Sequence, residues 1–579
     1  MPIFPVQRRS LILAAAAAFL MSSSCAQLKQ PEPEPYFAET PPPPVQEFRW
    51  ANGKPPKSLD PAKAAAAPET DIARALFEGL TDLDPQTLAA VPAVAERWDA
   101  SDDKRVWRFY LREEAVWSNG EKITAEDFVR SWKRLAALGD EAAHRALLKN
   151  IRGLADPAKR KEGKALEPTP SATPPPADGP PTASGPSPSE APVSAQETLG
   201  VAAEGDRVLR VELNIADPDL PQLLAHPIFR PVHDDPAPVD DDQMVTNGPF
   251  RLSSLSDESV VVDRSETYWD HDSVKLERVK FVSSETPEKA LEAYRSGAVD
   301  AVTNAEFSPA ALKLLEPFDD FRRTAHNALN FYEFNTKRAP FDDRRVREAL
   351  AIAIDREKIT EGELQGTTRP ANTFLPQGSK KELKLLMDLP KARSLLEEAG
   401  FPEGAGFPVV RLVINRNDTQ QRIARAVADM WSKNLGITTE IVTIELAELD
   451  AVRAAGDYDL IRRGVVMPTS NETASLLSIF EAEPTAAKTG TAVSVPRMDL
   501  QASNANIKPD TSPAPQAGRS PAPARLTTES EAVYEVRAIP LYFPTSYSLV
   551  KPYVAGFDSN SLDAPSLKTI HIDPKWRTR

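Results

Sequence analysis

The stretch FDDRRVREALAIAIDREKI, residues 341–359, decides the fold class of this chain of 579 residues. Its apolar side chains recur at the spacing of one helical face, which holds Val346, Leu350, Ala353 and Ile354. Asp342 or Asp343 stands at the expected N-cap, where a carboxylate accepts from an otherwise unpaired amide. The stretch therefore predicts an amphipathic helix that packs on a larger core.

A second helix of the same kind is predicted between two strands. Residues 422–436 place four apolar side chains on one face, namely Ile423, Val427, Met430 and Trp431, and Gly436 supplies a C-terminal stop. The flanking strands are VVRLVINR (409–416) and TTEIVTIEL (438–446), while VWRFYLR (106–112) and RVLRVELN (207–214) alternate like half-buried antiparallel strands. Alternating helices and strands indicate a mixed α/β fold.

The acidic balance of the chain excludes one class of partner. Lys and Arg number 69 against 84 Asp and Glu, a formal net charge of −15, whereas a nucleic-acid binder needs a basic face. No later apolar segment is long enough to span a membrane. Two proline-rich stretches, 167–196 and about 482–525, lack apolar periodicity, so we predict disordered insertions there.

The N-terminus has the order of a secretory signal peptide. Arg8 and Arg9 precede an apolar run from Leu11 to Leu20, and small residues follow up to Cys25. A buried N-terminal helix is the alternative, but basic, apolar and small regions rarely follow one another in this order. The RRSLI segment also loosely fits a twin-arginine export signal.

Cys25 is the only cysteine in the chain, so it has no disulfide partner. Small residues that end in a cysteine resemble a bacterial lipoprotein signal, in which the cysteine is lipidated, although Ser22 stands where that signal prefers Leu. The alternative is ordinary cleavage after Ala26, which would release the protein. Residues 26–46 are proline-rich, and we expect them to form an extended tether that does not pack.

The sequence nominates no catalytic set. Its six histidines lack metal-ligand spacing: His144, His226, His233, His271, His326 and His571. Neither a phosphate-binding Walker loop nor a G-x-S-x-G elbow is present. Adjacent acids such as Asp102 and Asp103 fit solvated loops or helix caps. We therefore expect a binding protein without cofactor or metal rather than an enzyme.

A set of motifs that follow one another in a fixed order is more informative than any one of them alone. The set comprises WANGKPPKSLDPAKAAAAPETDIARALFEGLTDLDP (50–85), VWRFYLREEAVWSNGEKITAEDFVRSWKRL (106–135), TNGPFRL (246–252), YWD (268–270), YRSGAVDAV (294–302), NTKRAPFDDRRVREALAIAIDREKI (335–359), KARSLLEEAGF (391–401) and IPLYFPTSYSLVKPYVAGF (539–557). In this order it resembles the extracytoplasmic solute-binding proteins of the oligopeptide/dipeptide ABC importer family, solute-binding protein family 5. The resemblance covers about 47–150, 200–480 and 528–575.

This resemblance implies a periplasmic-binding-protein type II-like α/β fold, with two hinged lobes that close on a ligand and a smaller third domain. The expected division is a signal peptide at 1–25, a tether at 26–46, lobe I at 47–83, 200–275 and 528–579, the smaller domain at 84–166, an insertion at 167–199, lobe II at 276–480 and a second insertion at 481–527.

The resemblance also implies where a ligand lies. Oligopeptide-binding members hold an extended peptide as an added strand. The implied contacts are Ala65, Ala66 and Ala67 on one side, Gly464, Val465 and Val466 on the other, Arg453 and Arg462 near the ligand's carboxylate, and His226, Tyr268 and Trp431 at the pocket wall. Core packing is an equal alternative for Trp431, which lies on an apolar helical stripe. Whether Arg462 or Arg463 faces inward is left open.

Two departures from the family pattern concern the ligand. Pro468 stands where the family has an Asp that pairs with a peptide's α-ammonium, and Val465 replaces a pocket Trp. Glu472 is the one nearby carboxylate that could replace the missing Asp. Low-complexity sequence between Phe480 and Thr527 replaces helices of the ligand-side lobe.

The resemblance implies a monomeric extracytoplasmic protein, anchored through Cys25, that captures peptides and delivers them to ABC permease subunits. The alternative is a diverged surface lipoprotein that keeps the fold for sensing or scaffolding and does not transport. An exported hydrolase is disfavoured, because no residues form a catalytic set.

Overall fold

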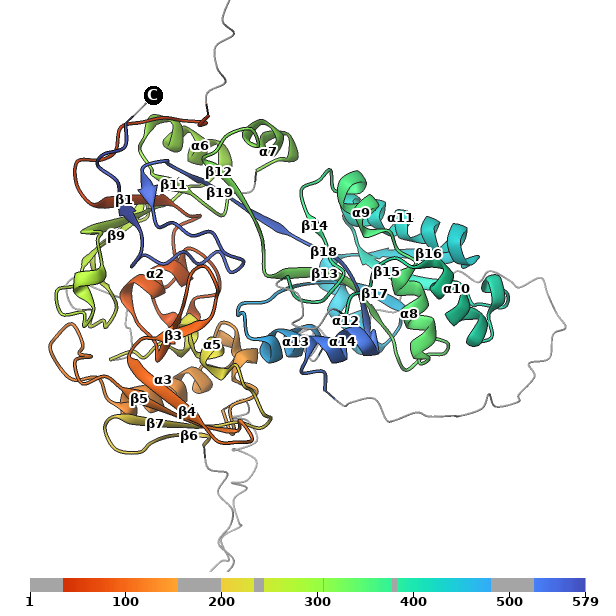
Figure 1. The fold of residues 1–579 in the computed structure, drawn as a ribbon, viewed down its shortest axis with the longest axis horizontal. Coiled ribbons are helices and arrows are strands. Elements are labelled where there is room, and N and C mark those ends of the chain that lie inside the picture. Colours follow the sequence, from red (N-terminus) through yellow and green to blue (C-terminus); the bar gives the residue numbers. More distant parts are fainter. Residues whose placement is uncertain are drawn as a thin grey trace, which may run out of the picture.

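The computed structural model describes residues 35–154, 199–233, 244–305, 307–376, 383–480 and 525–577. These residues form two lobes side by side and a third domain below the first lobe (Figure 1). The predicted signal peptide with Cys25, residues 167–198 and residues 481–524 lie outside the described ranges.

Lobe I is built on a seven-stranded sheet in the order β12-β19-β11-β1-β10-β9-β8. Its strands are β1 (Glu47–Ala51), β8 (Phe250–Leu255), β9 (Ser259–Arg264), β10 (Arg278–Val282), β11 (Ala301–Val302), β12 (Phe321–Ala325) and β19 (Thr545–Val550), and its helices are α2 (Glu69–Leu76), α6 (Pro287–Ser296) and α7 (Pro309–Leu315). The short strands β20 (Val554–Ala555) and β21 (His571–Ile572) pair beside it. Phe48, Trp50 and Phe281 lie in its core.

The third domain contains a four-stranded antiparallel sheet in the order β4-β5-β7-β6. Its elements are β4 (Ala95–Ala100), β5 (Val106–Leu111), α3 (Ala125–Ala137), β6 (Val201–Ala203), β7 (Val208–Glu212) and α5 (Leu220–Leu224), with the hairpin of β2 (Thr81–Leu83) and β3 (Ala90–Pro92) nearby. The predicted strands at 106–112 and 207–214 are therefore confirmed as neighbours. Thr124 and Asp127 form the capping box that starts α3.

Lobe II has a six-stranded sheet in the order β14-β18-β13-β17-β15-β16. Its strands are β13 (Ala328–Phe334), β14 (Arg369–Pro370), β15 (Val410–Asn415), β16 (Thr439–Ile444), β17 (Leu460–Val466) and β18 (Ala538–Phe543). Its helices are α8 (Arg344–Ile352), α9 (Arg356–Lys358), α10 (Leu389–Glu398), α11 (Asp418–Leu435), α12 (Leu449–Ala455), α13 (Glu472–Phe480) and α14 (Glu529–Glu535). β15, α11 and the parallel strand β16 form the expected α/β unit.

The helices that decide the fold class begin and end at capping residues. Asp343 caps α8, as predicted, but the expected single helix 341–359 ends at Ile352. Asp355 caps a separate helix, α9, because its side chain accepts from the amide of Lys358 and so competes with continuation of α8. α11 starts four residues earlier than predicted, and Gly436 ends it in a left-handed conformation with φ 69°.

The sheet memberships differ from the expected domain boundaries in three places. Residues 200–214 were expected in lobe I, but β6 and β7 pair with β5 of the third domain. Residues 276–325 were expected in lobe II, but β10 and β11 pair with β1 of lobe I. Residues 528–543 carry β18, which pairs with β13 of lobe II. The pattern of a strand does not reveal which sheet edge it joins, since pairing is a long-range choice.

The described part of the expected tether packs on lobe I, which corrects the prediction for residues 35–46. The amide of Phe37 donates to Asp320 at 2.8 Å, and its ring stacks on Tyr294 at 6.5 Å between centroids. Lys551 Nζ donates to the carbonyl of Ala38 at 2.9 Å. Aromatic and polar contacts together hold this proline-rich segment on lobe I.

Two neighbouring crossings join the lobes. β12 leads into β13 through residues 326–327, and β18 leads into β19 through Pro544, so paired strands run from one lobe into the other (Figure 1). The amide of His326 donates to the carbonyl of Pro544 at 2.9 Å. The two sheets, each packed in its own lobe, are thus joined by two adjacent strand connections.

Candidate functional site

The carboxyl-terminal half of β17 has one open edge. β13 pairs with β17 over its whole length, whereas β15 pairs with it only at Leu460 and Ile461. The amide of Met467 donates to the carbonyl of Asn327 at 2.7 Å, which fixes the alternation of the antiparallel ladder. The main-chain groups of residues 462, 464 and 466 therefore point away from β13, toward the edge that β15 leaves uncovered. Val466 is 61% exposed there.

The two arginines predicted to serve a ligand's carboxylate are engaged within lobe II. Arg453 Nε lies 3.1 Å from both carboxylate oxygens of Glu333. Arg463 donates to the same carboxylate at 2.6 Å and to the carbonyl of Ile479 at 2.6 Å. Arg462 lies on the other face of β17 and donates to Asn330 at 2.5 Å, while its Nε has no hydrogen-bond partner within the described ranges. Arg462 and Arg463 thus face opposite sides of the sheet.

Ala65, Ala66 and Ala67 line a cavity of about 520 Å³ in lobe I. Its opposite wall comes from the start of α6 and from the segment after β11, where Thr303 and Asn304 lie. The sequence prediction placed these alanines in lobe I, as one of the two segments that flank a ligand, with Gly464–Val466 as the other. The structure places them in lobe I, on the wall of a cavity large enough for several ligand atoms.

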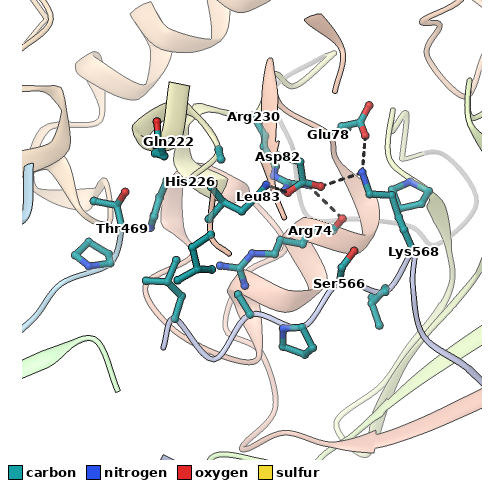
Figure 2. A pocket seen from close by; sticks show the side chains of 18 residues that line it. Arg74, Glu78, Asp82, Leu83, Gln222, His226, Arg230, Thr469, Ser566 and Lys568 are labelled. Atoms are coloured by element: carbon teal, nitrogen blue, oxygen red, sulfur yellow. Dashed lines mark hydrogen bonds and ion pairs between the residues drawn. The ribbon is translucent and has the colours of Figure 1, made fainter. Parts of the chain in front are cut away.

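A second, smaller pocket lies where lobe I, lobe II and the third domain meet, and we name it the junction pocket (Figure 2). It has a volume of about 40 Å³. Its lining comprises Arg74, Glu78, Asp82, Leu83, Leu88, Gln222, Ala225, His226, Arg230, Pro249, Pro468, Thr469, Leu562, Ala564, Pro565, Ser566, Leu567 and Lys568. Pro468 and Thr469 follow β17, so lobe II contributes one wall of this pocket.

Lys568 holds two carboxylates together at the back of the junction pocket. Its Nζ lies 3.2 Å from Glu78 and 2.9 Å from Asp82 (Figure 2). Glu78 also accepts from the Tyr268 hydroxyl at 2.5 Å and from Trp269 Nε1 at 2.6 Å. Burial alone would raise the pKa of Asp82, but Lys568 and Arg230 lower it to about 2. Burial alone would lower the pKa of Lys568, yet the two carboxylates raise it well above its ordinary value.

Arg230 and Arg74 are the remaining cations of this pocket. Arg230 is buried, and its nearest carboxylate is Asp82 at 3.7 Å. Its Nη1 donates to the carbonyls of Arg74, at 3.2 Å, and of Phe77. Arg74 pairs with Asp71 at 3.0 Å, one helical turn away. Burial lowers the pKa of Arg230.

His226 connects the junction pocket with the alanine cavity through His144. The two imidazole rings meet edge to face at 4.9 Å, and His144 Nε2 donates to the carbonyl of Ala65 at 2.7 Å. Burial and the neighbouring His144 hold the pKa of His226 well below its usual range, so this ring is neutral at pH 7. The predicted pocket position of His226 thus agrees with the lining of the junction pocket.

Tyr268 and Trp431 lie elsewhere than predicted. Tyr268 is buried behind Glu78 and acts on the pocket only through that carboxylate. Trp431 is fully buried in the core of lobe II, where its Nε1 donates to the carbonyl of Leu350. The apolar stripe of α11 is therefore core, and the assignment of Trp431 to a pocket wall is wrong. Glu472, the expected substitute for the missing Asp, accepts from the amide of Glu529 at 2.6 Å.

Sequence reasoning did not single out Arg74, Arg230, Asp82 or Lys568. The four come from separated segments that only the fold brings together, and none belongs to a spaced motif. Within the described ranges, no cluster of three His, Cys, Asp or Glu suits a metal ion, and no helix has the length and apolarity to cross a membrane.

Comparisons with known proteins agree with this architecture. The family model for bacterial extracellular solute-binding proteins, family 5 Middle, matches residues 89–486. The periplasmic oligopeptide-binding protein OppA of Salmonella typhimurium is 29% identical over 590 residues, covering 98% of this chain and 99% of that protein. The periplasmic murein peptide-binding protein MppA of Escherichia coli is 30% identical over 549 residues, covering 89% and 91%.

Solved structures give the same result. The murein tripeptide-binding protein MppA in its unliganded open form superposes with a TM-score of 0.68 at 27% identity, covering 92% of this chain and 98% of that one. Another structure of the Escherichia coli murein tripeptide-binding protein superposes with a TM-score of 0.56 at 25% identity, covering 92% and 99%. Because the family model spans more than half of the sequence, this chain belongs to the bacterial extracellular solute-binding proteins of family 5.

Proposed function

We propose that the protein is the extracytoplasmic, peptide-capturing component of an ABC importer and not an enzyme. The observation that carries this proposal is the open edge of β17 at residues 462–466. An extended peptide can add to such an edge as a strand, with main-chain hydrogen bonds for affinity and little demand on side chains. The names of the relatives, an oligopeptide-binding and a murein peptide-binding protein, favour this ligand class.

The ligand would be held between the two lobes. In this proposal the peptide pairs with β17 of lobe II, and Ala65–Ala67 of lobe I approach it from the opposite side on closure. The adjacent crossings at His326 and Pro544 support a hinge between the lobes. The TM-score of 0.68 against a relative in its unliganded open form supports an open arrangement of the present structure. Closure would then present the loaded protein to permease subunits.

One observation favours the second candidate, a surface protein that senses or scaffolds without transport. Glu333 already occupies Arg453, so this arginine is not waiting for a ligand. Arg462 remains on the other face of β17, where its side-chain partners are the neutral groups of Asn330 and Tyr542, and we assign it the role of reaching a ligand's carboxylate. Anchoring at Cys25 and a monomeric state are further parts of the proposal.

The test is native mass spectrometry of the purified full chain before and after gentle denaturation, combined with thermal unfolding in a mixed peptide pool. We expect bound species that fragment as peptides and an increase in melting temperature, because a ligand that binds only the folded state stabilises it by mass action. A bare protein that gains no thermal stability from the pool would refute peptide capture and favour the sensing or scaffolding role.

A further inference from the structure

The wall of the junction pocket carries more cations than it can neutralise. Three cationic side chains, Arg74, Arg230 and Lys568, line it with only two carboxylates, Glu78 and Asp82. Lys568 is in contact with both carboxylates, at 3.2 and 2.9 Å. The shared carboxylate of Asp82 is 3.7 Å from Arg230, beyond hydrogen-bond distance. The imbalance therefore falls on Arg230, because Arg74 also pairs with Asp71, outside the lining, at 3.0 Å.

Arg230 is the group with the larger deficit. Its side chain is 2% exposed, so water cannot compensate its charge. Two carbonyl groups accept from Nη1, but Nε has no hydrogen-bond partner within the described ranges. A buried guanidinium with an unpaired N–H and no close carboxylate lacks an acceptor that it needs, because buried donors are almost always paired. An acceptor from outside the chain would complete it.

The uncharged residues that line the pocket do not balance the positive charge of Arg230. His226 is uncharged at pH 7, Pro468 has neither charge nor amide hydrogen, and Thr469 offers only a hydroxyl. In Figure 2 the guanidinium of Arg74 points toward the side of the pocket on which His226 and Thr469 lie. Arg74 is 21% exposed, and its ion-pair partner, Asp71, lies outside the pocket lining.

The size of the pocket limits what can enter. A single ordered water needs on the order of 10–15 Å³ of such volume. The pocket, at about 40 Å³, therefore has room for one small polar group such as a carboxylate. An ammonium group of similar size would meet like charges and no free carboxylate.

We propose that the junction pocket binds a carboxylate of the ligand between Arg74 and Arg230, beside Pro468 and Thr469. This inference rests on the proposed peptide capture and names the ligand class more closely: the ligand end that reaches Pro468 is acidic, not a free α-ammonium. The carboxylate can come from an acidic group on a blocked amino end, or from the peptide's carboxyl terminus if the chain runs in the opposite direction.

The first experiment measures dissociation constants by intrinsic tryptophan fluorescence for one alanine pentapeptide in four forms: free amino end, N-acetyl, N-succinyl, and N-succinyl with a carboxyl-terminal amide. We expect the N-succinyl form to bind at least about tenfold more tightly than the free amine, because it brings a charge-assisted partner for the arginines. If the amide form loses most of the affinity and succinylation adds none, the carboxyl terminus is the source of the carboxylate, and the proposal holds in that form.

Two variants make the assignment specific. Arg74→Gln should remove most of the preference for the acidic form, whereas Arg130→Gln is the matched control, because Arg130 pairs with Asp127 at the same helical spacing and lies outside the pocket lining. Pro468→Asp places a carboxylate in the wall itself and should reverse the preference toward the free amine.

Equal binding of all four forms, unchanged by Arg74→Gln and Pro468→Asp, would overturn the inference while leaving peptide capture intact. If neither these peptides nor the mixed pool binds, peptide capture fails and the inference fails with it. Thermal unfolding of each variant shows whether it is folded.

Discussion

The Glu333 cluster of lobe II and the junction pocket contain the same types of side chain but differ in local charge balance. In lobe II, one carboxylate accepts from both Arg453 and Arg463, and all three groups are largely buried. At the junction, Lys568 lies between two carboxylates and Arg230 is left 3.7 Å from one of them. An arginine that is available to a ligand is therefore identified from its partners, not from its place in a motif.

The largest expected effect comes from breaking the balanced cluster. Glu333→Gln leaves Arg453 and Arg463 without their shared carboxylate in a largely buried site. Removing one partner of a buried ion pair costs about 3–5 kcal/mol, so we expect a loss of stability of that order in urea unfolding. The control is Glu285→Gln, which breaks the exposed pair with Lys289 and should leave the unfolding midpoint nearly unchanged. Equal midpoints for the two variants would show that the Glu333 cluster is not a stability element.

Asp217 is a carboxylate with no ion pair in the described ranges, so its pKa shifts in the opposite direction from that of Asp82. Asp217 is buried and accepts from Asn471 Nδ2 at 3.1 and 3.0 Å, a neutral contact between the third domain and lobe II. Burial raises the pKa of Asp217 from 3.8 to about 6. The folded state therefore binds this proton more tightly than the unfolded state, and the stability that protonation gives is lost as pH rises through about 6.

Thermal unfolding between about pH 4 and 8 tests this expectation. The wild type should lose stability across that interval, by at most about 3 kcal/mol from this group at about 1.4 kcal/mol for each pKa unit. Asp217→Asn should show a shallower dependence, while Asp71 and Glu529, whose pKa values burial also raises to about 6, stay in both proteins. Parallel curves for the two proteins would contradict the assignment.

Substitution of Asp82 tests the charge balance of the junction pocket, as substitution of Glu333 tests that of lobe II. Asp82→Asn removes one of the two carboxylates from Lys568 and the nearest one from Arg230. We expect a cost of about 1.5–3 kcal/mol in stability, the range for hydrogen bonds to charged groups, together with tighter binding of the N-succinyl pentapeptide. Glu333→Gln should show the first effect without the second. Weaker binding of the acidic peptide by Asp82→Asn would place the carboxylate elsewhere.

Local patterns predicted the elements well because they depend on neighbours in sequence. The cap at Asp343, the stop at Gly436 and the strands at 106–112 and 409–416 all follow from short-range rules. The lobe boundaries did not follow, since they depend on the pairing of β10 with β1 and of β18 with β13, strands that lie far apart along the chain.

For the candidate site, sequence reasoning succeeded only in locating the main-chain segments that the family resemblance identifies. The segments Ala65–Ala67 and Gly464–Val466 do lie at a cavity wall and at an open strand edge. Side-chain roles depend on partners that a single sequence does not reveal. Arg453 was predicted to bind ligand but pairs with Glu333. Arg230 was not singled out, because nothing in the sequence predicts that it is buried beside Asp82, a carboxylate that already pairs with Lys568.

The smallest expected effect concerns the open edge itself and separates main-chain from side-chain binding. The amide of Val466 points to the uncovered side of β17, so Val466→Pro removes one donor for an added strand without removing a bond to β13. One main-chain hydrogen bond contributes about 1–1.5 kcal/mol, so peptide affinity should fall about tenfold. Val466→Ala keeps the amide and deletes most of the exposed side chain, and it should bind as the wild type does. If the alanine variant loses as much affinity as the proline variant, the side chain rather than the strand edge holds the ligand, and the arginines at the junction would become its main anchor.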